Sequence, residues 1–96
     1  MAHSLSAKKR IRQNEKRRQH NHAIKAQAKT ATRRFLEAVK AGELQKAEEY
    51  LAVAYKRIDK AVKRRIFHKN AGARKKSRLA QILNEAKQEA AVTANE

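Results

Sequence analysis

The sequence predicts an all-α protein: a three-helix bundle whose long basic first helix extends beyond the bundle. Apolar residues recur at spacings of three and four in three successive segments, which is the period of helices that each bury one face. The 96 residues include no proline and only two glycines, so few positions interrupt a helix. About half of the hydrophobic residues are alanine, which indicates a thin core between closely packed helices.

The first helix divides into a polar part and an amphipathic part. Its amphipathic part carries one apolar face, made of Ile24, Ala28, Ala31, Phe35, Ala38 and Val39. The preceding stretch "KKRIRQNEKRRQHNH", residues 8–22, consists of good helix formers but has no apolar side chain after Ile11. We term residues 1–23 the basic arm. Because like charges without tertiary support disfavour a helix, we expect the free arm to be frayed or disordered and to fold when bound.

The second helix is expected to follow a break at "KAGEL". Gly42 suits the left-handed position that ends a helix, and Glu43 places a negative charge at the start of the next one. The apolar face of this helix comprises Leu44, Ala47, Leu51, Ala54, Tyr55, Ile58, Ala61 and Val62. A short turn requires the helix to pack antiparallel to the first.

The third helix is expected to begin near Asn70, a residue suited to the N-cap position. Its apolar face comprises Leu79, Ile82, Leu83, Ala86 and Ala90. Lys75 lies one turn before Leu79 on the same side, so burial is expected to start near residue 79. The whole chain, residues 1–96, is predicted to form one domain, with a bundle at 24–91 and a frayed tail at 92–96.

Charge is concentrated in two segments. The formal net charge is +16, of which residues 1–34 carry +10 and residues 63–78, here termed the second basic block, carry +8. The intervening residues 35–62 are neutral, and residues 79–96 carry −2. Antiparallel helices bring the two basic segments to the same end of the bundle. A charge of this size indicates a polyanionic partner, which is RNA, DNA or an anionic surface.

Several classes of function have no support in the sequence. Without cysteine there is no disulfide or thiolate metal site, and His20 and His22 point to opposite sides of a helix, so no metal site is expected. We find no catalytic constellation, and therefore expect no enzyme activity, cofactor or small-molecule substrate. No apolar run approaches the length of a membrane span and no signal peptide is recognisable, which predicts a soluble intracellular protein without a membrane partner.

The distribution of basic and aromatic residues favours structured RNA. Basic side chains of the arm point in nearly every direction around the helix, as suits a helix surrounded by phosphates. Only four residues are aromatic, too few for stacking along a single strand. Phe35 and Tyr55 are predicted to be core residues, whereas Phe67 could cap the bundle or stack on a base. His68 is interpreted as a hydrogen-bonding partner of phosphate or ribose.

Two segments resemble a known family. "SAKKRIRQNEKRRQHN" at residues 6–21 and "IDKAVKRRIFHKNAGARKKSRLA" at residues 58–80 are similar to the bacterial small-subunit ribosomal protein twenty family. The resemblance implies a three-helix bundle that binds 16S ribosomal RNA directly, beside other components of the small subunit, and supports its folding and assembly in the cytoplasm. Relatives usually have a Lys-Gly pair where this chain has Arg64 and Arg65, so the bend before the third helix is expected to be shifted or gentler.

The candidate RNA-binding residues lie in both basic segments. Carried over by position, the resemblance implies RNA contacts by Lys8, Lys9, Arg10, Lys16, Arg17, His20, Asn21, His68, Lys69, Asn70, Arg74, Lys75, Lys76 and Arg78. Further basic residues of the first helix complete the candidate site: Arg12, Arg18, Lys25, Lys29, Arg33 and Arg34. The main alternative is a nucleoid-type helical protein that binds duplex DNA non-specifically. A helix at an anionic lipid surface is disfavoured because residues 12–22 have no apolar face to insert. A partner of acidic proteins or chaperone-like helper is a further alternative, and it would not sediment with ribosomes.

Overall fold

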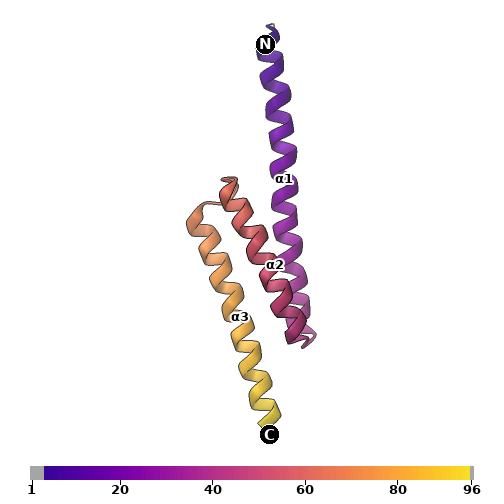
Figure 1. The fold of residues 1–96 in the computed structure, drawn as a ribbon, viewed down its shortest axis with the longest axis vertical. Helices are drawn as coiled ribbons and strands as arrows, with labels where there is room; N and C mark the ends of the chain where they lie inside the picture. Colours follow the sequence, from indigo (N-terminus) through magenta and orange to yellow (C-terminus); the bar gives the residue numbers. More distant parts are fainter. Residues whose placement is uncertain (1–3, 96) are drawn as a thin grey trace.

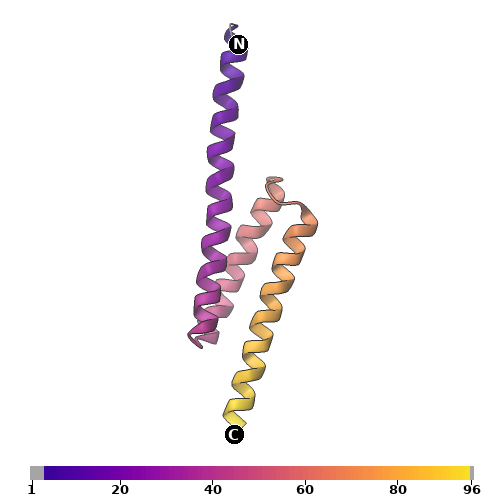
Figure 2. The same cartoon turned by 180° about the vertical axis from the view of Figure 1, so that it is seen from behind.

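The computed structural model describes residues 4–95, which form three helices and, within that range, no strand. They are α1 (Leu5–Lys40), α2 (Leu44–Lys63) and α3 (Lys69–Asn95). Figures 1 and 2 show α2 running antiparallel to both neighbours, with the first half of α1 projecting from one end and the last part of α3 from the other. Most packing joins α1 to α2, and α1 scarcely touches α3. The predicted all-α fold with a long first helix is confirmed.

The arm is helical over its described part. Ser4 caps α1, its Oγ accepting a hydrogen bond of 3.1 Å from the backbone N–H of Ala7. The helix then continues without a break to Lys40, a length of about 54 Å at 1.5 Å per residue. Almost every side chain before Ile24 is exposed, so this part of the helix has no packing partner in the bundle, and the expected fraying of the free arm stays a prediction.

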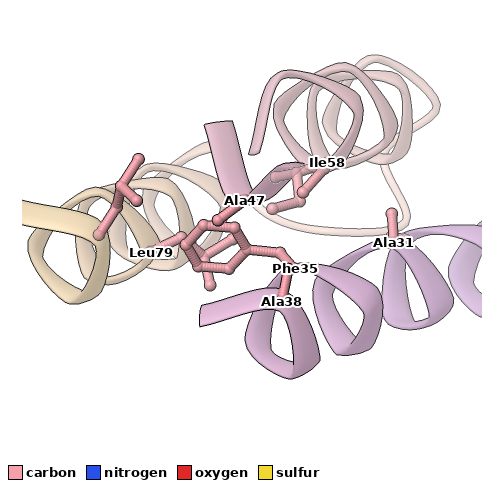
Figure 3. Close-up of a cluster of buried hydrophobic side chains, with 9 residues drawn as sticks. Ala31, Phe35, Ala38, Ala47, Ile58 and Leu79 are labelled. Carbon is pink, nitrogen blue, oxygen red and sulfur yellow. The ribbon is translucent and has the colours of Figure 1, made fainter. Parts of the chain in front are cut away.

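The core lies where the sequence places it. On α1, the predicted residues Ile24, Ala28, Ala31, Phe35 and Ala38 are all buried. Figure 3 shows the ring of Phe35 pointing from α1 toward Ala47 of α2 and Leu79 of α3. Phe35 and Ile58 are the largest fully buried side chains among the described residues. A core that combines few large side chains with many alanines allows the helices to approach closely.

Not every residue of the predicted apolar faces is buried: six are half-buried at the edge of the core, namely Val39, Leu44, Leu51, Val62, Ile82 and Ala86, and two lie elsewhere. Tyr55 is only half-buried, at the junction of α2 and α3, because its hydroxyl needs a polar partner and donates a hydrogen bond of 3.2 Å to the carbonyl of Lys76. Ala90 is exposed, and it belongs to the last part of α3, which projects from the bundle (Figure 1). The helix continues to Asn95, so residues 92–95 are helical where a frayed tail was predicted; Glu96 is outside the described residues.

The first turn follows the prediction. Gly42 has φ of +77°, the left-handed conformation that glycine adopts without strain. The N–H of Gly42 donates to the carbonyl of Val39, and the N–H of Glu43 donates to that of Ala38. These two bonds form a Schellman motif, which satisfies the last carbonyl groups of α1.

The second turn has the same construction without a glycine. Arg65 adopts φ of +60°, its N–H donates to the carbonyl of Val62, and the N–H of Ile66 donates to that of Ala61. The turn is therefore tight, and the expectation of a gentler bend is wrong. Arg65 itself takes the left-handed conformation, because the Schellman hydrogen bonds and the packing of the next helix require a tight turn there.

Replacing Arg65 with glycine is expected to stabilise the protein. A side chain in the left-handed region is strained, whereas glycine is not, and the gain exceeds the added flexibility of the unfolded chain. We expect the free energy of unfolding to rise by about 0.5–1 kcal/mol in Arg65→Gly. Gly42→Ala is the companion variant, because its new Cβ would meet no atom within 4 Å. We expect its free energy of unfolding to fall by about 1 kcal/mol, and this loss would come from backbone strain alone. Urea unfolding measures both, and a destabilised Arg65→Gly would contradict this account.

The start of α3 differs from the prediction in two respects. The helix begins at Lys69, and the residue at its N-cap is His68, whose Nδ1 accepts a hydrogen bond of 3.1 Å from the N–H of Asn70. Asn70 therefore lies in the first turn and is not the cap. Burial also starts earlier than residue 79, because Gly72 is buried against α2. The absence of a side chain there brings the two backbones together two turns before Leu79.

Gly72→Ala is expected to destabilise the protein, although alanine is normally the better helix residue. A Cβ at position 72 would overlap with Cγ2 of Val62 and lie 3.6 Å from Cγ2 of Ile58. Because a β-branched side chain cannot easily move away, we expect a loss of about 1–3 kcal/mol. Thermal unfolding of the variant beside the original chain measures this loss of stability. In the double variant with Val62→Ala the added methyl group has room, so most of the penalty of Gly72→Ala should vanish; an unchanged penalty would exclude the clash as its cause.

Candidate nucleic-acid interface

The arm presents its candidate residues to solvent on all sides. The exposed residues are Lys8, Lys9, Arg10, Arg12, Lys16, Arg17, Arg18, His20 and Asn21. Within the described part of the arm, the ion pair joins Arg18 Nη2 to Glu15 Oε1 at 2.9 Å, which leaves the other guanidinium and ammonium groups without a carboxylate. The resulting surface is cationic around the whole helix. Figures 1 and 2 show this part of α1 projecting from the bundle formed with α2 and α3.

The second basic block lies at the end of the bundle from which the arm projects. Figures 1 and 2 both place the turn after α2 and the start of α3 at that end, here termed the basic end. The predicted convergence of the two segments is thus present in the structure. The turn also exposes Lys63, Arg64 and Arg65, which the list of candidate residues omitted. Their charge was visible in the sequence, but only the turn shows that all three face solvent.

The residues of α3 fall into two groups. His68, Lys69, Asn70, Arg74 and Arg78 are exposed, and Arg74 and Arg78 lie one turn apart beside Ser77. The His68 ring uses Nδ1 to cap α3, which turns Nε2 away from the helix terminus as a donor. This group can contact phosphate or ribose oxygens by giving up bound water only. No contact within the fold has to break.

Lys75 and Lys76 are partly engaged within the protein. Lys76 Nζ lies 3.0 Å from Asp59 Oδ1 and 5.2 Å from the centre of the Tyr55 ring, and its side chain is 33% exposed. It therefore joins α3 to α2 and is the least available of the predicted RNA-binding residues. Lys75 Nζ lies 5.1 Å from the centre of the Phe67 ring and remains exposed.

The remaining candidates on α1 point in two directions. Lys25, Lys29 and Arg33 follow one stripe of the helix and line a groove toward α3. Arg34 instead lines the depression between α1 and α2 together with Arg57. Arg57, whose Nη1 donates a hydrogen bond of 3.1 Å to Gln27 Oε1, was not predicted, since the sequence places it among the alternating charges of α2.

Acidic residues gather at the opposite end of the bundle. They include Glu37, Glu43, Glu48, Glu49, Glu85 and Glu89. Glu43 pairs with Lys46 at 3.7 Å, and Lys87 pairs with Glu48 across α2 and α3. The described chain thus has a basic end with an extended arm and an end of mixed, slightly acidic character.

Other kinds of site find no support among residues 4–95. Within that range no three His, Asp or Glu residues are placed to hold a metal ion. None of the helices described has a stretch sufficiently long and apolar to pass through a lipid bilayer.

Comparison with known proteins identifies the family. Residues 2–84 match the family described as ribosomal protein S20. The chain belongs to the ribosomal protein S20 family. It is 46% identical over 88 residues to the small ribosomal subunit protein bS20 of Thermobifida fusca, covering 92% of this chain and 96% of that one. It is 50% identical over 84 residues to bS20 of Desulforudis audaxviator (88% and 96% covered) and 48% identical over 84 residues to bS20 of Mycobacterium bovis (88% and 98% covered).

Membership of the S20 family confirms the resemblance read from the two basic segments. The matched range contains the arm from residue 2, all of α2 and the first half of α3. As a member of a ribosomal protein family, the chain is a structural constituent of the ribosome and not an enzyme. The predicted location on cytoplasmic ribosomes agrees with this assignment.

Proposed function

We propose that the chain is a component of the small ribosomal subunit that binds 16S ribosomal RNA directly and supports its folding and assembly with the other components of the subunit. The observation that carries the proposal is the exposure of cationic side chains around the whole circumference of the arm. A helix lying on one duplex would need only one basic face. A helix that is basic on all sides suits a position between several RNA helices.

The mechanism is the neutralisation and bridging of phosphates. RNA helices that pack together repel one another, and cations placed between them lower that repulsion. The bundle, residues 24–91, serves as a rigid base, and the arm and the second basic block reach the RNA from the basic end. The whole chain acts as one domain. The acidic residues at the opposite end favour an orientation with that end away from the RNA.

The arm gains stability when it binds. The described part of the arm projects from the bundle with nearly all its side chains exposed, so its helix depends on intrinsic propensity against the repulsion of neighbouring cations. Phosphates around the arm remove that repulsion. We therefore expect circular dichroism to report less helix in the free protein at low salt than in the RNA complex.

The RNA contacts are assigned to the exposed candidate residues of the arm, of α1 and of the start of α3. Lys76 contributes less to these contacts, because its ammonium group already pairs with Asp59. The exposed turn residues Lys63, Arg64 and Arg65 join this set. Recognition relies mainly on the shape of the folded RNA, since duplex RNA offers phosphates and 2′-hydroxyls rather than readable base edges.

The test compares folded 16S RNA with duplex DNA of equal length. Each is titrated from about 50 to 200 mM salt, a range in which several phosphate contacts cost orders of magnitude in affinity. The proposal expects tight RNA binding that persists at the upper salt while DNA binding is lost. Equal and equally steep curves for both would overturn it in favour of a nucleoid-type DNA-binding protein, the alternative that the net charge of +16 also allows.

A further inference from the structure

The structure contains a groove between α1 and α3 whose apolar floor the proposed phosphate contacts do not use. It has a volume of about 680 Å³, in the range of sites that take a compact organic molecule. Its floor is apolar: Ala28 and Ile58 are buried core residues, Phe67 is half-buried, and Leu36 is 41% exposed. The groove remains open because α1 and α3 scarcely touch each other.

The rim of the groove is cationic. Lys25, Lys29 and Arg33 stand along the α1 side at intervals of four residues, and Lys75 stands on the α3 side. The acid nearest to this rim in the ion pairs of the described chain is Glu37, whose Oε1 lies 3.8 Å from Arg33 Nε, and both side chains are 70% exposed. A weak exposed pair of this kind leaves the rim positive. The groove thus combines an apolar floor with an anion-binding edge.

We propose that this groove seats one unstacked nucleotide of the bound ribosomal RNA, with its base on the apolar floor and its flanking phosphates against the rim. This inference rests on the proposed function. An extruded base has two apolar faces, which pack well on aromatic and aliphatic side chains, and it carries a phosphate on each side. The stripe formed by Lys25, Lys29 and Arg33 continues the arm, so RNA that follows α1 passes over the opening.

The dimensions favour a base over a helix of another protein. A docked amphipathic helix needs an apolar groove that receives anchors over several turns. Here the large apolar side chains within reach are Leu36 and the half-buried Phe67. The ammonium group of Lys75 lies 5.1 Å from the centre of the Phe67 ring. A positive charge beside the ring strengthens the attraction for an anionic nucleotide.

The test removes the flat ring and the exposed leucine from the floor of the groove and keeps every charge. In the double variant Leu36→Gln, Phe67→Leu the flat ring is lost, while leucine still fills the place where Phe67 packs against the core. We expect the affinity for folded 16S RNA to fall about tenfold, with the salt dependence unchanged because no phosphate contact is removed. Val92→Gln, which alters a valine that is 60% exposed near the far end of α3, is the matched control and should bind like the original chain.

Chemical probing of the RNA provides a second readout. We expect one nucleotide whose base is protected from dimethyl sulfate by the original chain and becomes reactive with the double variant, while protections of the backbone persist. Circular dichroism and thermal unfolding verify that the variant is folded.

Unchanged affinity and unchanged protections in the folded double variant would overturn the inference and leave the proposed RNA binding intact. If the variant binds isolated 16S RNA normally but fails to enter small subunits, the groove is occupied by a protein, which also overturns it. Failure of the original chain to bind 16S RNA would instead refute the proposed function itself.

Discussion

Replacing Arg12, Lys16 and Arg17 with glutamine is expected to weaken binding to folded 16S RNA by about 100-fold or more near 0.1 M salt. Each phosphate contact that is lost removes about one unit from the slope of the logarithm of affinity against the logarithm of salt. Three contacts therefore lower the slope by about two to three units. All three side chains are exposed on the part of α1 that projects from the bundle, so the melting temperature should scarcely change.

The control for this prediction removes the same charge at the other end. Replacing Lys40, Lys46 and Lys87 with glutamine changes the net charge by the same amount but acts near the acidic residues of the opposite end. Filter binding over a series of salt concentrations compares the two triple variants. An equal loss in both would mean that the RNA responds to net charge alone. A large fall in the melting temperature of the arm variant would show that the arm packs on the bundle.

Phe35→Ala is expected to have the largest effect on stability. The ring is fully buried at the junction of all three helices, where it contacts the small side chains of the core (Figure 3). Removing a buried phenyl group costs about 3–5 kcal/mol, through lost transfer energy and the cavity left behind. A loss of that size is a large part of the total stability of a small domain. Thermal unfolding followed by circular dichroism should show a lowered transition.

Leu51→Ala tests whether burial determines these costs. Leu51 packs against the same cluster but is only half-buried, so its loss should cost about 1–2 kcal/mol, less than a fully buried leucine. If Leu51→Ala destabilised the protein as much as Phe35→Ala, the core would have to be centred on α2 rather than around the Phe35 ring.

Much of the candidate interface could be predicted because charge and helical period are local properties. The arm residues were expected to be exposed and are exposed, and antiparallel connections placed the second basic block at the correct end. The pairing of Lys76 with Asp59 was not predictable, since it joins residues 17 apart on two different helices. The same holds for the separation of Arg34 from Lys25, Lys29 and Arg33, which depends on where α2 and α3 lie around α1.

The sequence by itself determined three helices, the apolar face of each, the first turn and a basic end, because an amino-acid pattern of period 3.6 and a left-handed glycine need only neighbouring residues. Tertiary structure decided the rest. It made α2 the central helix, forced Arg65 into a left-handed conformation, brought Gly72 against Val62 and moved the cap of α3 to His68. It also left the groove between α1 and α3 open. These features arise from the fit of one helix against another, and that fit depends on side chains far apart in the chain.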